Sequence, residues 1–476
     1  MLSSKHKMIL SSGRFSGTSR GQLTAAFDQL ASSPNQDKLV IHFHGGLVSE
    51  KSGEEIADRL LPFYQGAGGY PFFVLWQSGL IETVKNNWRE MIGEDVFSLL
   101  VEKVMQFVLG KLDQAPGEKG LEVELPSSLE VRDVIETKQA AGEVPYAERD
   151  DDAKDLDGEL TPTEQAQFEA LLSTDAAFIS AASEISRSDA PELNPVLEAE
   201  LAEAQVAAPG EKGLVSTTTL VAAGVHVLAR VVKRFAGRRD HGIYATVVEE
   251  VARELKGDLI GGLLWKHIKK DTEDTFIGNS DTHGGVALLE EISRLWQTGH
   301  KPRILLIGHS AGSIYICNLL KKAAETLPQE IRFEVVFLAP GCSFNLLDKT
   351  FKEAGDRIAA FRSFGMADEL EMRDAILPPV YLYSLLYCVS GLFEEKVDLP
   401  LVGMQRYHGA STSFDPGQFP EIKRVLNETA AFAHPWIWSD SAAGSGLNTL
   451  SHSHGSFDNE EKTLESLAFL ISHGGF

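Results

Sequence analysis

The chain has 476 residues, with 44 Lys and Arg against 68 Asp and Glu, and a formal net charge of −24. Its composition is 43% hydrophobic and 24% charged, which allows a large buried core and excludes a disordered or fibrous protein. The negative charge repels phosphate backbones and no basic stripe offsets it, so nucleic acid is not an expected partner. The three cysteines lie far apart without a C-x-x-C pair, so neither a disulfide framework nor a zinc site is expected.

The amino-terminal segment predicts no secretory signal. Its apolar stretch covers only residues 8–10, far fewer than the roughly 7 to 15 residues of a signal core. The expected location is therefore the cytoplasm.

Short apolar runs alternate with helical patterns along the chain. Enrichment in β-branched and aromatic residues predicts strands at residues 39–43, 72–76, 304–307, 333–338, 358–364 and 436–438. Helical spacing of apolar residues predicts helices at 53–64, 286–297 and 313–324, and longer ones at 84–109 and 246–268. This alternation predicts an α/β fold, with a mostly parallel sheet covered by helices on both faces.

One segment holds most of the negative charge. Residues 111–216 carry 25 acidic and 8 basic residues, a net charge of −17, and the other 370 residues carry −7. The heptapeptide APGEKGL occurs near both ends, at 115–121 and 208–214, and its Pro-Gly pair is typical of a turn or linker. Ala/Glu-rich stretches between the two copies predict a helical insertion that is mobile or partly disordered.

The strongest local signal is the G-x-S-x-G motif at residues 308–312. It follows an apolar strand directly and opens an apolar helix, which is the context that a nucleophile elbow requires. We expect Ser310 to adopt a strained backbone conformation that projects its hydroxyl. Side chains at positions 308 and 312 would then clash with the backbone, which explains both glycines.

A second motif, His42-Phe43-His44-Gly45-Gly46-Leu47, follows the first predicted strand. Its glycines allow backbone N–H groups to approach a developing negative charge. The alternative is an ordinary Gly-Gly turn in which His44 is simply hydrogen-bonded.

The two motifs and the strand order together resemble the α/β-hydrolase superfamily, over about residues 8–78 and 284–476. The resemblance implies a catalytic domain at 1–78 and 284–476 and a helical cap or insertion at 79–283, with the acidic segment 111–216 inside it. The cap leaves the sheet at the carboxyl end of a strand, the edge at which ligands bind in such folds.

The family's order of nucleophile, acid and histidine implies roles for further residues. Asp368 matches the acid, in the loop after the strand at 358–364, and Glu369 and Asp374 are alternatives. His454 matches the base, because a glycine follows it and a predicted helix comes next. The alternative bases are His452, His473 and His408.

The resemblance implies the chemistry of a serine hydrolase. His454 would accept the proton of Ser310 as it attacks a carbonyl, and Asp368 would hold the imidazole. The implied oxyanion hole is made by Gly45, Gly46, Leu47 and Ala311. No cofactor is expected.

The expected substrate is a carboxylic ester, either a small molecule or a lipid. Residues 217–232, 261–268 and 375–393 are apolar enough to line an acyl pocket or to touch a membrane surface, although packing against the core is favoured. Residues 375–393 contain no charge over 19 positions, near the minimum for a membrane span. Amide, peptide or thioester hydrolysis would use the same triad, and a non-catalytic binding or regulatory role for the acidic insertion is a further alternative.

One acidic stretch resembles part of a calcium-binding EF-hand loop. Asp155, Asp157 and Glu164 fall at positions three, five and twelve, with Gly158 at position six. Position one is Ala153, which removes a ligand, so this calcium site is a weak hypothesis next to a solvated acidic turn.

Overall fold

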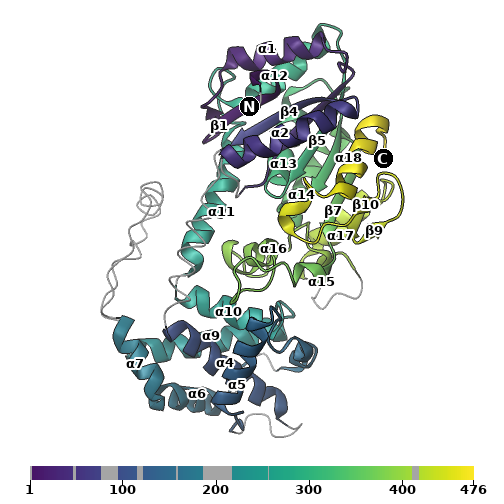
Figure 1. Cartoon of the computed structure of the whole chain (residues 1–476). Coiled ribbons are helices and arrows are strands. Elements are labelled where there is room, and N and C mark those ends of the chain that lie inside the picture. Colours follow the sequence, from purple (N-terminus) through teal and green to yellow (C-terminus); the bar gives the residue numbers. More distant parts are fainter. Residues whose placement is uncertain are drawn as a thin grey trace.

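The computed structural model describes residues 3–46, 50–76, 95–114, 122–156, 159–185, 217–255, 257–409 and 418–476. An α/β body and a helical body lie at opposite ends of an elongated molecule, and α11 (Gly257–Asp274) runs between them (Figure 1). Both copies of the heptapeptide lie outside the described residues, as do residues 84–94 of one expected helix.

An eight-stranded sheet forms the centre of the α/β body. Its strands are β1 (Lys7–Ser11), β2 (Arg14–Phe15), β3 (Lys38–Phe43), β4 (Tyr70–Trp76), β5 (Arg303–His309), β6 (Phe333–Leu338), β7 (Ile358–Met366) and β8 (Trp436–Ser439). Their order is β2-β1-β4-β3-β5-β6-β7-β8, and each neighbouring pair is parallel except β1 with β2. The expected α/β fold with a mostly parallel sheet is confirmed. A separate short pair joins β9 (Ser441–Ala442) and β10 (Asn448–Thr449).

Helices cover both faces of the sheet. One face packs against α2 (Glu50–Gly66) and α18 (Glu461–His473). The other face packs against α1 (Arg20–Ala31), α12 (Gly284–Gln297), α13 (Gly312–Thr326), α14 (Phe344–Ala354) and α17 (Pro420–Thr429). Because successive side chains of a strand point to opposite faces, Val40 and Ile41 of β3 belong to different hydrophobic clusters. Burial on both faces explains why the central strands are nearly continuous apolar runs.

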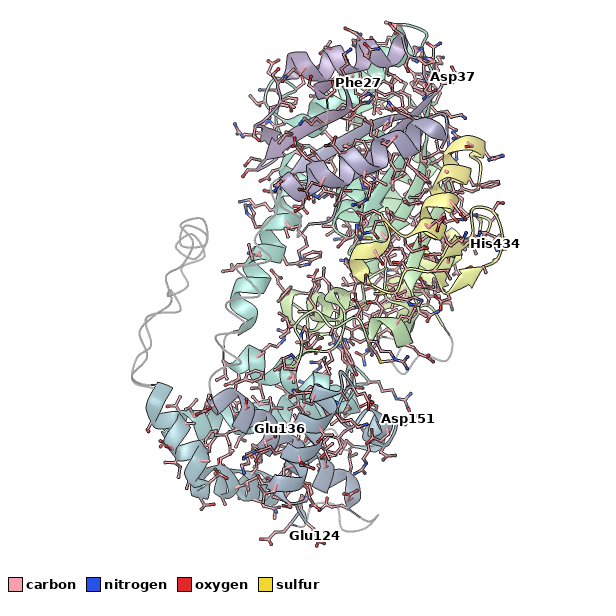
Figure 2. All side chains as sticks on the ribbon, in the orientation of Figure 1. Phe27, Asp37, Glu124, Glu136, Asp151 and His434 are labelled. Carbon is pink, nitrogen blue, oxygen red and sulfur yellow. The ribbon has the colours of Figure 1, made fainter. Side chains whose placement is uncertain are left out.

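The described parts of residues 79–283 are largely helical. They form α4 (Asp95–Asp113), α5 (Ser128–Ala140), α6 (Pro162–Thr174), α7 (Ala176–Ile185), α9 (Thr217–Ala236), α10 (Ile243–Glu254) and α11. Buried apolar side chains of α4 and α9 supply much of the core of the helical body. Figure 2 labels three acidic residues on this body, Glu124, Glu136 and Asp151.

The prediction of a single helix at 246–268 is wrong, because the structure has two helices there. Helix α10 ends at Glu254 with Leu255 as its C-cap, and α11 starts at Gly257. Glycine is a weak helix former and favours a break. The apolar pattern continues on both sides of Gly257, so periodicity alone did not reveal the change of direction.

A second excursion, between β7 and β8, meets the helical body. It contains α15 (Asp368–Glu371), α16 (Leu385–Cys388) and a π-helical turn, η5 (Val389–Phe393). This turn packs against α11, where a Cβ on Gly261 would lie only 2.0 Å from Phe393. Within the described residues, no helix is both long and apolar enough to cross a membrane. The charge-free run at 375–393 includes η5, which packs against α10 and α11.

Candidate active site

The G-x-S-x-G motif forms the turn between β5 and α13. Ser310 has a φ of +51°, a left-handed conformation that residues with a side chain rarely adopt. A Cβ on Gly308 would lie 2.7 Å from the carbonyl carbon of Gly312, and one on Gly312 would lie 2.3 Å from the carbonyl oxygen of Phe43. The expected strand, sharp turn and helix are therefore present, and both flanking positions require glycine.

Hydrogen bonds from neighbouring strands and loops hold this strained turn. The N–H of Ser310 donates to the carbonyl of Leu338 at 2.9 Å. The carbonyl of Ser310 accepts from the N–H of Gly341 at 3.0 Å and from the hydroxyl of Ser313 at 2.6 Å. Ser310 is 4% exposed. The turn is thus anchored to the end of β6 and the loop after it.

The glycine loop after β3 lies against the elbow. A Cβ on Gly46 would lie 2.7 Å from the Cβ of Ala311, so the structure brings these two expected oxyanion residues together. Ala311 is the N-cap of α13, and N–H groups at a helix start have no partner within the helix. Gly45 precedes Gly46 in this loop, and Leu47 lies outside the described residues.

His44 fixes the glycine loop. Its Nδ1–H donates to the carbonyl of Gly45 at 2.6 Å, and its Nε2 accepts from the N–H of Trp76 at 3.1 Å. Burial lowers the pKa of His44 to about 4, so the ring is neutral at pH 7. The ring also stacks on Trp76 with 4.1 Å between centroids, which supports a structural role for His44.

His454 lies near the elbow with a free imidazole. It begins the short 3-10 turn η8 (His454–Ser456), is 7% exposed, and neither ring nitrogen has a hydrogen-bond partner. Burial, and then the charge of His309, lower the pKa of His454 to about 3, so its ring is neutral. The rings of His454 and His309, the residue before Ser310, have centroids 5.5 Å apart. No hydrogen bond joins His454 to Ser310, and such bonds are often long in enzymes without substrate.

Of the three candidate acids, Asp374 contacts the segment of His454. Its carboxylate accepts a hydrogen bond from the backbone N–H of His454 at 2.7 Å. Asp368 instead accepts from the hydroxyl of Tyr387 at 2.7 Å, and no hydrogen bond joins it to His454. Glu369 is exposed. The structure therefore does not pair the expected acid with the expected base.

The alternative histidines lie in other surroundings. His452 is exposed and contacts Asp440. His473 is exposed at the end of α18, where its Nδ1–H donates to Phe469. His408 is half-buried, and its Nε2–H donates to the carbonyl of Val402 at 2.8 Å.

The buried pair of His309 and Asp458 lies beside the elbow and was not predicted from the sequence. His309 Nδ1 lies 3.3 Å from Asp458 Oδ2, and His309 Nε2 lies 2.8 Å from the carbonyl oxygen of His454. Asp458 also accepts from Arg59 of α2 at 3.0 Å. His309 is the variable residue before the serine in the motif, and Asp458 follows His454 by four positions, so both could have been found by asking which charges flank the two catalytic candidates.

Helix α11 packs beside the elbow. Ile268 packs against Gly46, and Trp265 packs against Gly341, whose N–H binds the carbonyl of Ser310. The indole N–H of Trp265 donates to Glu394 of the second excursion at 2.6 Å. The helix that connects the two bodies therefore supplies an apolar wall beside Ser310.

Of the three candidate acidic side chains in the EF-hand-like stretch, the structure describes only that of Glu164. Glu164 is fully buried, pairs with Lys111, and caps α6 together with Thr161. Asp157 and Gly158 lie outside the described residues, and the side chain of Asp155 is also not described. In the described part of the chain, no group of three or more His, Cys, Asp or Glu side chains could hold a metal ion.

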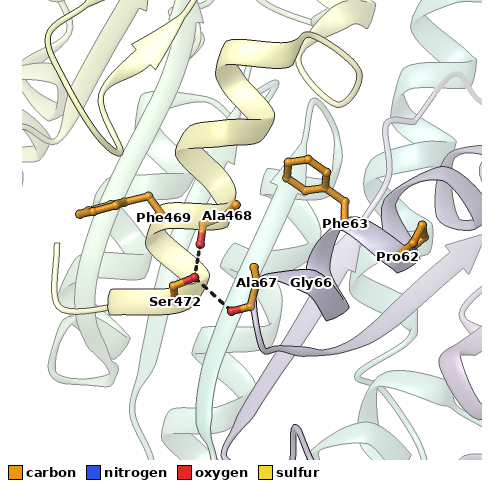
Figure 3. A pocket seen from close by; sticks show the side chains of 7 residues that line it. All are labelled: Pro62, Phe63, Gly66, Ala67, Ala468, Phe469 and Ser472. Carbon is orange, nitrogen blue, oxygen red and sulfur yellow. Dashed lines mark hydrogen bonds between the residues drawn. The ribbon is translucent and has the colours of Figure 1, made fainter.

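A surface hollow of about 430 Å³ lies between α2 and α18 (Figure 3). It is lined by Pro62, Phe63, Gly66, Ala67, Ala468, Phe469 and Ser472. Ser472 accepts a hydrogen bond from Lys38, the first residue of β3, so the hollow lies at the amino-terminal edge of the sheet. Ligands of such sheets bind at the carboxyl edge, where Ser310 lies.

Comparisons of the chain with models of protein families, with curated proteins and with solved structures gave no match.

Proposed function

We propose that this chain is a serine hydrolase of the α/β-hydrolase fold that cleaves a carboxylic ester through an acyl-enzyme. The observation that carries the proposal is the left-handed backbone of Ser310, with a φ of +51°, at the carboxyl end of β5. Such strain costs on the order of 1 to 3 kcal/mol in a residue other than glycine. A purely structural turn would avoid that cost with glycine at this position, whereas a nucleophile elbow needs the hydroxyl.

The strand order supports the proposal. Seven parallel strands run in the order β1-β4-β3-β5-β6-β7-β8. The glycine loop follows β3, the serine follows β5, the acidic residues follow β7, and His454 follows β8. Every candidate group thus starts from the same edge of the sheet.

In the proposed reaction, the imidazole of His454 takes the proton of Ser310 as its Oγ attacks the ester carbonyl. The N–H groups of Ala311 and Gly46 bind the developing oxyanion. His454 then protonates the leaving alcohol and activates a water molecule, which hydrolyses the acyl-enzyme.

We propose Asp374, the alternative acid, as the residue that orients His454. Its carboxylate already holds the backbone N–H of His454 at 2.7 Å. The Nδ1 of a histidine lies within a few ångströms of its own backbone nitrogen, so a small rotation brings the same carboxylate to the ring. Asp368 would need to leave Tyr387 first.

An acyl or lipid ester fits the surroundings of Ser310. Ile268 and Trp265 are buried apolar residues that pack beside the elbow, and such side chains favour an aliphatic chain over a charged group. The net charge of −24 further disfavours anionic substrates.

The proposal is tested with p-nitrophenyl esters of increasing acyl length. Wild type should hydrolyse them, with a preference for longer chains, and Ser310→Ala should lose at least about 10³-fold in kcat. Ser173→Ala, at an exposed position of α6, is the matched control and should retain full activity. Equal rates for wild type and Ser310→Ala would reject the serine mechanism. A preference for p-nitrophenyl acetate would reject only the expected preference for long acyl chains.

A further inference from the structure

The ring of His309 faces a hydrogen-bond acceptor at each nitrogen. Asp458 Oδ2 lies 3.3 Å from Nδ1, and the carbonyl oxygen of His454 lies 2.8 Å from Nε2. A carbonyl and an ionised carboxylate can only accept, and a neutral imidazole carries only one N–H. Both contacts are therefore satisfied together only by an imidazolium ion.

The surroundings of His309 favour this charged form. Burial alone would lower the pKa of His309, but the hydrogen bond and charge of Asp458 outweigh it and raise the pKa. The pKa of Asp458 is lowered by the same contact, against its own burial. The titratable and charged groups around the ring are His42, His44, Arg59, His454 and Asp458. Burial lowers the pKa of His42 to about 3 and that of His44 to about 4, so neither competes as a cation.

The main chain of His454 is held on both sides, while its ring is not held. Asp374 binds its N–H and His309 binds its carbonyl. Neither ring nitrogen has a partner. The place of the imidazole is therefore set by the backbone that carries it.

We propose that His309, kept as an imidazolium by Asp458, is a positioning residue that fixes His454 next to Ser310. The inference rests on the proposed function, because it assigns a role relative to the base of that reaction. His309 acts through the carbonyl of His454 and does not touch the substrate.

The proposal predicts how activity depends on pH. We call the two hydrogen bonds of the His309 imidazolium, to Asp458 and to the carbonyl of His454, the clamp. Since the pKa of His309 is raised above its ordinary value of 6.5, the clamp is complete below about pH 6.5 and is lost as the pH rises through the raised value. A neutral His309 would then point a lone pair at one of its two acceptors. We therefore expect kcat to fall on the alkaline side.

The first test removes and restores the donor. His309→Leu should lower kcat about 10²-fold, since a displacement of about 1 Å costs that much, with little change in KM. His309→Gln, which keeps an amide donor, should recover part of the loss. An unchanged kcat in His309→Leu, or a loss confined to KM, would overturn the positioning role.

The second test removes the charge and keeps the shape. In Asp458→Asn the amide can donate to Nδ1 of a neutral His309, while Nε2–H still donates to His454. This variant should therefore lose the alkaline fall in kcat. The same alkaline limb as in wild type would overturn the proposal, even if His309→Leu does not fold.

A third readout is independent of catalysis. In protein labelled with ¹⁵N-histidine, the resonances that disappear in His309→Gln should show both ring nitrogens protonated at pH 6.5. A single protonated nitrogen would overturn the imidazolium clamp. If this signal is present but wild type hydrolyses no ester, the proposed function fails and the ion pair is structural only. The two failures are therefore distinguishable, because the clamp is tested by the signal and the function by ester hydrolysis.

Discussion

Four buried histidines near the elbow differ in what their rings bind. His44 is locked by Gly45 and Trp76, His42 Nδ1 bonds to the hydroxyl of Tyr64 at 3.0 Å, and His309 lies between two acceptors. Of these four, His454 alone has both ring nitrogens without a partner. A buried polar atom without a partner costs about 1 to 3 kcal/mol, and the proposed role of His454 as the base would account for a ring that is left without partners.

The two candidate acids give a matched pair of variants. Asp374→Asn should lower kcat by roughly 10²-fold or more, because the carboxylate that orients His454 and stabilises its imidazolium form is lost. Asp368→Asn should change kcat little, since its carboxylate bonds to Tyr387. The kcat values of both variants on one p-nitrophenyl ester decide between them. A large loss in Asp368→Asn alone would restore Asp368 as the acid.

At the residue scale, the sequence was enough to predict the elbow and not enough to choose the acid. The elbow is local, because Gly308, Ser310 and Gly312 satisfy a steric requirement within five positions. Asp368, Glu369 and Asp374 share one loop and one residue type. Which carboxylate reaches His454 depends on the path of the chain after β7, and that path depends on packing against distant helices.

At the scale of elements, α10 joins the helical body to the α/β body through buried charges. Glu249 of α10 pairs with Arg234 at 2.7 Å and accepts from the hydroxyl of Tyr381 at 2.6 Å. His241 lies between Glu249, at 2.8 Å, and Asp398 of the second excursion, at 2.9 Å. The joint is therefore held by charges that compensate one another, and removing one leaves the others uncompensated.

This joint predicts acid sensitivity. Burial alone would raise the pKa of Glu249, but the facing His241 and Arg234 lower it from 4.5 to about 2. Ionised Glu249 therefore contributes fully to stability above about pH 4.5, and the contribution is lost as the pH falls toward 2. Glu249→Gln should lower the free energy of unfolding at pH 7 by about 3 kcal/mol and flatten its decline below pH 4.5.

Urea unfolding between pH 3 and 7 measures both effects. Glu169→Gln, at an exposed position of α6, is the control and should follow wild type at every pH. If Glu249→Gln keeps the pH dependence of wild type, the joint does not depend on the charge of Glu249.

At the scale of the whole molecule, the alternation of strands and helices was sufficient to predict the sheet. The strands β1 and β2, at one end of the sheet, were missed; β1 has five residues and β2 only two. The excursion between β7 and β8 was also missed. The turn η5 of this excursion contacts α10 and α11. These contacts join segments more than 100 positions apart, so no local sequence pattern could predict them.

The most direct test of the central claim is labelling with a fluorophosphonate probe, followed by mass spectrometry of the modified peptide. One modified residue, Ser310, is expected, and Ser310→Ala should not be labelled. Labelling should be slowed by at least about 10²-fold in His454→Ala and unchanged in His452→Ala, whose side chain is exposed. Failure of wild type to react, or equal labelling of Ser310→Ala, would contradict the assignment of this chain as a serine hydrolase.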